Sequence, residues 1–251
     1  MVVCQVDRLH CTFPVSIRSV LNDLPKTLDE TYGRSLLGLD EEKREYAQRL
    51  FQCLTVSIRP IRIEELAEVL AVRFNGTAIL TFDPVWRPES AEEAVMSACS
   101  SLIAVVDREG RHVVQFSHFS VKEFLTSERL AAAEERLSSC YHILPMHAYI
   151  ILVHACLSVL LQFDHEIDND TIGQFPLALY AARYRIDHTQ FRDVSLDIRE
   201  VMKHLFDPAK PHFAAWLWLY DIDRHWIQPM SSIHPTQLRL GHFIMLLCGF
   251  Q

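Results

Sequence analysis

Lysines next to glycines are the first residues to look for when asking whether this chain handles nucleotides, because a phosphate-binding loop ends in a lysine that directly follows a glycine. None of the five lysines has that neighbour; they are Lys26, Lys43, Lys122, Lys203 and Lys210. Residues 103–107 are four apolar residues and an aspartate, the pattern of a Walker B strand. Without a phosphate-binding loop that strand has no phosphate to serve, so a plain strand is the favoured interpretation. We therefore expect no nucleotide hydrolysis by this chain.

Other catalytic and metal-binding patterns are also missing. The sequence has no G-x-S-x-G motif, so it does not predict an esterase. Its thirteen histidines and seven cysteines form no H-E-x-x-H, no C-x-x-C and no compact Cys/His set. His147 and His154 lie in an apolar stretch and are expected to be core or interface residues. The sequence predicts no catalytic residue, no metal ligand, no cofactor and buried free thiols.

Four helices are predicted in the first half of the chain. The first begins after Thr27, which has the spacing of a capping box with Glu30, and it ends near Gly38. The second is predicted over 41–58, and its inward residues are expected to be Tyr46, Leu50, Cys53, Leu54 and 56–58.

The next helices are shorter. An acidic first turn predicts a helix over 63–70, and a proline-bearing loop is expected over 74–88. Ser90 and Glu93 repeat the capping-box spacing, which predicts a helix over 91–100.

The hydrophobic period then changes from helix to strand. Residues 102–107 and 112–116 are rich in β-branched side chains, and 108–111 connect them. This pattern predicts a hairpin. Residues 121–125 return to a helical pattern, with Ser120 as the expected cap. Helices, a hairpin and a closing helix have the order of a winged helix.

Beyond residue 138 the pattern is helical. Helices are predicted near 146–163, 175–187, 195–206 and 212–220, with a boundary near 139–145. The fold class is thus mainly α: a winged-helix domain, formed by helices and a β-hairpin wing, followed by an all-helical segment. The aromatic residues of the last helix are expected to pack in a core, and any part of that face left exposed would favour self-association; they are Phe213, Trp216, Trp218 and Tyr220, with Trp226 nearby.

Several stretches carry a resemblance to a known family. Residues 24–32 (LPKTLDETY), 51–70, 115–125 (QFSHFSVKEFL) and 177–188 (LALYAARYRIDH) resemble fungal NACHT-type STAND proteins. In those proteins an NTPase domain precedes a winged-helix domain, which is also described for GPI inositol-deacylase-like proteins, and ankyrin or other repeats commonly follow.

The resemblance implies a domain organisation. Residues 1–40 would be a helical linker leading out of an NTPase domain that this chain lacks. Residues 41–138 would be the winged-helix domain, and 139–251 a helical domain ending about where ankyrin repeats start. The chain then looks like a fragment of a cytoplasmic signalling protein, of an innate-immunity-like type. Its expected partners are the NTPase domain and the ankyrin repeats of a parent protein.

The resemblance also implies a role for one histidine. His118 lies between the second wing strand and the closing helix, a position that resembles the sensor histidine of STAND winged helices. There the imidazole reaches the ADP phosphates in the NTPase domain and holds the inactive state. Imidazole suits this role because it can donate to phosphate oxygens. The chain departs from the usual plant motif by having Phe119 where aspartate is common.

A winged helix has a competing use, which is DNA binding. The formal net charge of −8 has the wrong sign for contacts with phosphates, and the expected recognition helix, 91–99, contains two glutamates and no lysine or arginine. We therefore expect no nucleic-acid partner and keep a DNA-binding regulator as the alternative. A hydrolase, the third candidate, would need a nucleophile beside a base, and no spacing indicates one.

Membrane insertion and secretion are not expected. Residues 143–163 are almost entirely apolar, but they contain Pro145, His147, His154 and Gln162 and lack flanking basic clusters. Asp7 and Arg8 interrupt the region where a secretory signal needs its apolar stretch. The sequence therefore favours a cytoplasmic, non-catalytic regulatory module.

Overall fold

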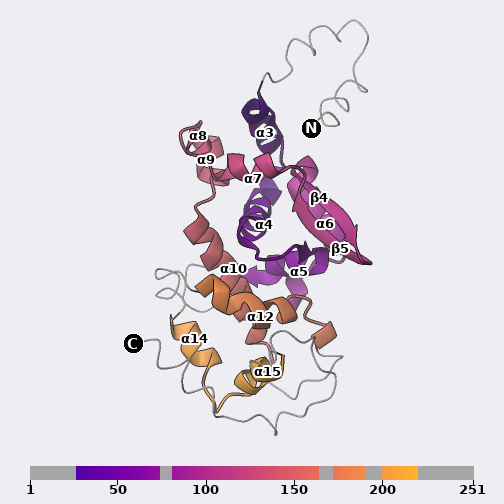
Figure 1. The fold of residues 1–251 in the computed structure, drawn as a ribbon, viewed down its shortest axis with the longest axis vertical. Coiled ribbons are helices and arrows are strands. Elements are labelled where there is room, and N and C mark those ends of the chain that lie inside the picture. The colour runs from indigo at the N-terminus through magenta and orange to yellow at the C-terminus, as the bar shows by residue number, and fades with distance from the viewer. Residues whose placement is uncertain (1–26, 74–80, 164–171, 190–198, 220–251) are drawn as a thin grey trace, which may run out of the picture. The chain divides into compact units, whose positions relative to one another are not determined.

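The computed structural model describes residues 27–73, 81–163, 172–189 and 199–219 (Figure 1). In these ranges the chain is mainly helical, with one three-stranded and one two-stranded antiparallel sheet. It divides into two compact units, the first formed by residues 1–67 and 89–148 and the second by 68–88 and 149–251.

Helix α3, Leu28–Leu37, is the first element of the first unit within the described residues. Thr27 caps it, because its hydroxyl oxygen accepts a hydrogen bond of 3.2 Å from the Glu30 amide, as the capping-box spacing predicts. Asp29 and Glu30 place negative charge at the positive end of the helix dipole. The helix buries Tyr32 and Leu36, which belong to the core of this unit.

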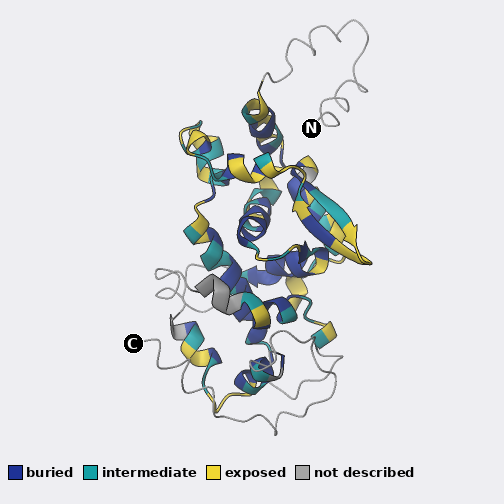
Figure 2. Ribbon diagram, viewed as in Figure 1, coloured by how far each residue is buried: buried dark blue, intermediate teal, exposed yellow. Residues whose placement is uncertain are grey.

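Helix α4, Arg44–Val56, is the central helix of the first unit. It follows a 3₁₀ turn, Glu41–Lys43, in which the Asp40 carboxylate accepts from the Glu42 amide. Its buried face contains residues three or four apart, and these are Ala47, Leu50, Phe51 and Leu54. Figure 2 shows this helix largely in the colour of buried residues.

The orientation of α4 corrects one prediction. Tyr46 and Ile58 were expected to point inward, but they are 39% and 49% exposed. Ala47, three residues before the buried Leu50, takes the core position in place of Tyr46. The other residues predicted to point inward from the helix are buried, and these are Leu50, Cys53, Leu54 and Val56. Ile58 lies beyond Ser57, where the backbone becomes extended and the helix has ended.

Three strands form the sheet of the first unit in the order β1-β5-β4. Strand β4, Ile103–Arg108, pairs with β5, Arg111–Phe116, as the predicted hairpin. The short strand β1, Ile61–Arg62, adds to the other edge of β5. The hairpin buries Val113 and Val114 and exposes its tip, as Figure 2 shows.

Helices precede and follow this hairpin. Helix α6, Ala91–Cys99, packs against α4, and the predicted cap is confirmed, since Ser90 Oγ accepts from the Glu93 amide at 3.2 Å. Helix α7, Phe119–Leu125, follows β5 directly, and the short helices α8, Glu128–Ala131, and α9, Glu135–Tyr141, come next. The predicted order of helices, hairpin and closing helix is confirmed.

Two helices contribute to both units, and these are α5, Ile63–Glu68, and α10, Pro145–Leu160. In the second unit, a 3₁₀ turn, Val69–Ala71, leads to β2, Val72–Arg73, which pairs with β3, Thr81–Phe82. A second 3₁₀ turn, Pro84–Trp86, follows. The stretch 74–88, predicted as a loop, thus contains a strand and a helical turn, and residues 74–80 lie outside the described residues.

The rest of the second unit is helical where it is described. Its helices are α12, Ala178–Thr189, α14, Arg199–Leu205, and α15, Pro211–Leu219. Phe213 and Trp216 of α15 are buried, and the Trp216 indole donates to the Ala182 carbonyl of α12 at 3.4 Å. This confirms the core role predicted for these two aromatic residues. Tyr220, Trp226 and the side chain of Trp218 lie outside the described part of the chain.

In the ranges that the structure describes, each helix alone is too short or too polar to cross a membrane. The pair Glu135–Tyr141 and Pro145–Leu160, bent by 43° at its break, meets the length and composition of a span only when taken together.

Candidate functional site

His118 is the residue between the wing and the closing helix, as the sequence predicts. It is exposed, and its backbone is extended at a position two residues after strand β5 ends and just before α7 begins. The structure corrects the expected cap: His118, and not Ser120, caps α7, because the Ser120 amide donates to His118 Nδ1 at 3.2 Å. An imidazole nitrogen that accepts this bond takes over the role that a serine or aspartate oxygen usually plays at a helix start.

A hydrogen-bonded chain of three side chains extends from this imidazole. Ser120 Oγ lies 2.6 Å from His118 Nδ1, and Tyr32 Oη lies 2.7 Å from Ser120 Oγ. The hydrogen bond from the Ser120 amide assigns Nδ1 as the unprotonated nitrogen, and with that assignment the Ser120 hydroxyl is a second donor to the same lone pair. Tyr32 then donates to Ser120. In the neutral ring this arrangement leaves the proton on Nε2.

The two ends of this chain differ in exposure. Tyr32 is only 5% exposed and packs against Phe124 of α7, with the ring centroids 5.6 Å apart. His118 is exposed, and its Nε2 has no hydrogen-bond partner in the described parts of the chain. Ser120 therefore holds the Nδ1 side of the imidazole, and Nε2 is left available to donate a hydrogen bond.

Phe119, the residue after His118, lies beside this imidazole. The two ring centroids are 4.4 Å apart, and Phe119 is 68% exposed. An aspartate would place a negative charge next to the ring, whereas phenylalanine adds an uncharged aromatic surface. The approach to Nε2 thus has no acidic neighbour at this position.

The predicted wing strand contains the aspartate that imitates a Walker B residue. Asp107 lies near the tip of the hairpin, and its Oδ1 accepts from the Gly110 amide at 3.0 Å. This carboxylate therefore stabilises the turn, as expected of a plain wing strand.

Helix α6 is the position at which a winged helix would carry its DNA-recognition surface. Glu92 and Glu93 are exposed in its first turn. The exposed tip of the hairpin has Arg108 and Arg111, but Asp107 and Glu109 offset their charge. Neither element offers the basic surface that duplex phosphates require.

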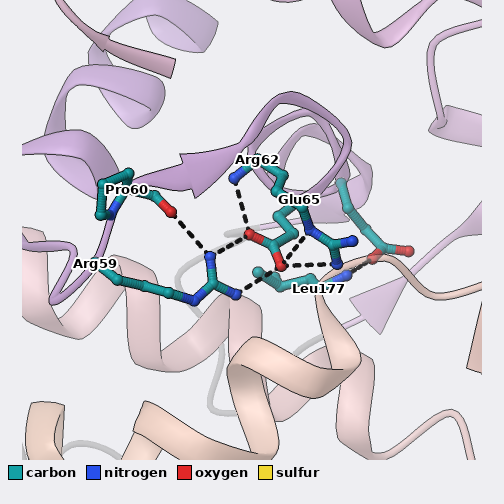
Figure 3. Close-up of polar contacts among 6 residues, drawn as sticks. Arg59, Pro60, Arg62, Glu65 and Leu177 are labelled. Atoms are coloured by element: carbon teal, nitrogen blue, oxygen red, sulfur yellow. Dashed lines mark hydrogen bonds and ion pairs between the residues drawn. The ribbon is translucent and has the colours of Figure 1, made fainter. Parts of the chain in front are cut away.

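Two buried glutamates are polar sites that sequence reasoning missed. Glu65 of α5 is fully buried and binds both Arg59 and Arg62, and Figure 3 shows its carboxylate between their guanidinium groups. Arg59 donates through two nitrogens at 2.7 and 2.8 Å, and the Arg62 amide donates at 2.8 Å. Burial alone would raise the pKa of Glu65, but these donors and charges outweigh it and hold the pKa below its ordinary value.

Glu68 forms a separate cluster in the second unit. It is 3% exposed, pairs with Arg87 and accepts from the Leu177 amide at 2.6 Å, a contact drawn in Figure 3. The Arg87 guanidinium lies 5.0 Å from the ring centre of Phe82 and 4.8 Å from that of Phe175. A carboxylate at the start of α12 also suits the positive end of that helix. Both glutamates thus stabilise the fold.

Histidine and cysteine side chains are the remaining candidates for metal binding and thiol chemistry. Among the residues that the structure describes, no group of three or more His, Cys, Asp or Glu could hold a metal ion. His147 is exposed on the first turn of α10, and His154 is partly buried further along it. Of the described cysteines, Cys53, Cys99 and Cys156 are buried free thiols, as predicted, and Cys140 is partly exposed. Burial raises the pKa of Cys53 to about 12, so its thiol stays protonated.

Comparison with known proteins identifies the first half of the chain. Residues 36–135 match the family described as the winged helix domain of GPI inositol-deacylase. This part of the chain is a winged-helix domain. His118 and its hydrogen-bonded chain lie in the winged-helix domain, except that Tyr32 precedes the matched residues. The predicted fold class, a winged helix followed by helices, is confirmed.

A curated relative extends the likeness beyond the winged-helix domain. The chain is 31% identical over 212 residues to the azaphilone pigments biosynthesis cluster protein L of Monascus ruber. The alignment covers 81% of this chain and 44% of that protein, so the chain spans less than half the length of its relative. No solved structure matches the chain.

Proposed function

We propose that the chain is a non-catalytic regulatory and interaction module of a NACHT-type signalling protein. It couples a nucleotide switch in an adjoining NTPase domain to downstream repeats. His118 is the residue that senses the nucleotide, by donating from Nε2 to a phosphate of bound ADP. This function requires two packing states of the NTPase domain against the winged-helix domain, one of which the contact from His118 favours.

The presentation of His118 is the observation that carries the proposal. Nδ1 contacts the amide and the hydroxyl of Ser120, His118 is exposed, and Nε2 has no hydrogen-bond partner in the described chain. A neutral imidazole fixed in this way donates to a phosphate oxygen without further ordering. A serine that donates to a histidine is also the pairing of a nucleophile with its base, but a hydrolase needs a third group to orient that base, and in the described chain His118 Nε2 has no such partner.

ADP binding tests the proposal most directly. A NACHT-type NTPase domain would be joined ahead of residue 1, and ADP affinity measured by calorimetry. We expect His118→Ala to weaken ADP binding about tenfold to a hundredfold, which corresponds to the loss of a hydrogen bond to a charged group.

A second exposed histidine provides the matched control. His147 lies on α10 away from the wing, so His147→Ala should leave the affinity unchanged. Equal ADP affinity for the original protein and the His118→Ala variant would rule out the sensor role.

A further inference from the structure

Tyr32 and His118 come from distant parts of the sequence, yet one hydroxyl links them. Ser120 Oγ lies between Tyr32 Oη, at 2.7 Å, and His118 Nδ1, at 2.6 Å. Tyr32 belongs to α3, and Ser120 lies in the first turn of α7. The side chain of Tyr32 is almost fully buried, so its hydroxyl group is held by the packing of α3 rather than by solvent.

We propose that Tyr32 is a positioning residue for His118, acting through Ser120. The buried tyrosine orients the Ser120 hydroxyl so that its proton points at Nδ1, and the ring is kept in the tautomer that carries its proton on Nε2. The inference deepens the proposed nucleotide sensing and rests on it for its functional meaning. It makes α3 part of the sensor, since a shift of α3 removes the donor that orients Ser120.

The hydrogen bond from the Ser120 amide to His118 Nδ1 supports this assignment. At a helix start the backbone amides need an acceptor, and Nδ1 serves as that acceptor for the Ser120 amide at 3.2 Å. A proton on Nδ1 would point at this amide and leave it without a partner. A serine oxygen that donates its proton can still accept a hydrogen bond, and the Tyr32 hydroxyl is the donor for Ser120 Oγ. Each group in the chain then has a single consistent role.

The tautomer of His118 can be measured in the 251-residue chain without any nucleotide. In a sample labelled with ¹⁵N at histidine, the ring nitrogens distinguish the two neutral tautomers, and His118→Gln assigns the signal. We expect the original protein to show one tautomer, protonated on Nε2. Ser120→Ala should shift the ring toward a mixture of both tautomers, and Tyr32→Phe should do so to a smaller extent.

Tyr46→Phe is the matched control, because Tyr46 is a partly exposed tyrosine on α4. It should leave the tautomer of His118 unchanged. A proton on Nδ1 in the original protein, or an unchanged ring in both Tyr32→Phe and Ser120→Ala, would overturn the proposal. Thermal unfolding of each variant identifies a general loss of folding, which Tyr32→Phe should not cause.

A double-mutant cycle separates positioning from packing. In the protein joined to an NTPase domain, Tyr32→Phe should weaken ADP binding about twofold to tenfold, the effect of one ordinary hydrogen bond. The same change should have no effect in the His118→Ala background, since Tyr32 acts only through that ring. Additive effects would show that Tyr32 contributes by packing alone. If the tautomer changes as expected but His118→Ala leaves ADP binding intact, positioning holds and the proposed nucleotide sensing fails.

Discussion

Glu65 shows how this chain keeps a charge inside its core. Burying a carboxylate destabilises the folded state unless the charge is paired and hydrogen-bonded. Arg59 and Arg62 provide both kinds of contact to Glu65. The two arginines are about one-third exposed, at 31% and 33%, so they keep part of their hydration. The cluster ties the residues around β1 to the first turn of α5.

Replacing this carboxylate should destabilise the protein. Glu65→Gln keeps the shape of the side chain but removes the charge, and we expect a loss of about 2 kcal/mol in the free energy of unfolding at neutral pH. Urea unfolding followed by circular dichroism measures it. Glu64→Gln, at the exposed neighbouring position, is the control and should have little effect.

The same pair of variants has a predicted pH dependence. The pKa of Glu65 is lower in the folded protein than in the unfolded chain, where a glutamate titrates at about 4.3. The stabilisation is therefore fully present above that unfolded pKa and is lost as the pH falls through the folded pKa. The difference in stability between the original protein and Glu65→Gln should shrink in acid, and a constant difference would contradict the cited pKa shift.

The sequence predicts local residue roles better than distant ones. The caps at Thr27 and Ser90 follow from residues three positions apart, and both are confirmed. The contact between Tyr32 and Ser120 joins residues 88 positions apart and has no periodic signal. His118 was identified by its position in the chain, but its use as the cap of α7 was missed because histidine is not a usual capping residue.

At the level of elements, the wing hairpin depends on a two-residue turn. Glu109 and Gly110 both have positive φ, 57° and 75°, as the turn between Arg108 and Arg111 requires. A side chain at Gly110 would meet no atom within 4 Å, so the cost of adding one is backbone strain alone. Gly110→Ala should therefore lower stability by about 1 kcal/mol in thermal or urea unfolding.

A second glycine and a second substitution test this explanation. Gly173 also has open space around it but does not have a positive φ, so Gly173→Ala should be neutral or slightly stabilising. Glu109→Asn should stabilise the hairpin, because asparagine adopts positive φ more readily than glutamate. A destabilising Glu109→Asn would show that the turn is not limited by its backbone conformation.

Elements with strong patterns were predicted, and short ones were not. The hairpin has strands of six residues each that contain adjacent β-branched residues, which give a clear strand signal. Strands β1, β2 and β3 have two residues each, too few for any period, and they exist only because a partner strand is nearby. The inner face of α4 was predicted correctly at Leu50, Cys53, Leu54 and Val56, which are buried, and wrongly at Tyr46 and Ile58, which lie near or beyond the helix ends.

At the level of the whole chain, the compact units do not follow the linear sequence. Residues 68–88 group with the helical second half, and the bond from the Leu177 amide to Glu68 joins positions 109 apart. Prediction from sequence divides a chain into consecutive segments, so it could not assign residues 68–88 to the same unit as residues 149–251. The division into 1–40, 41–138 and 139–251 stays a prediction.

The charge of the chain favours one of the two uses of a winged helix. The formal net charge of −8, exposed Glu92 and Glu93 on α6 and a wing tip whose charges offset each other all oppose the electrostatic attraction that duplex binding needs. We expect no mobility shift of duplex DNA at low salt. The variant with Glu92→Lys and Glu93→Lys is the control, because it tests whether α6 can contact DNA once its charge is reversed. Retardation of DNA by the original protein, weakening steeply as salt is added, would instead favour a DNA-binding regulator, because release of counterions is the signature of phosphate contacts.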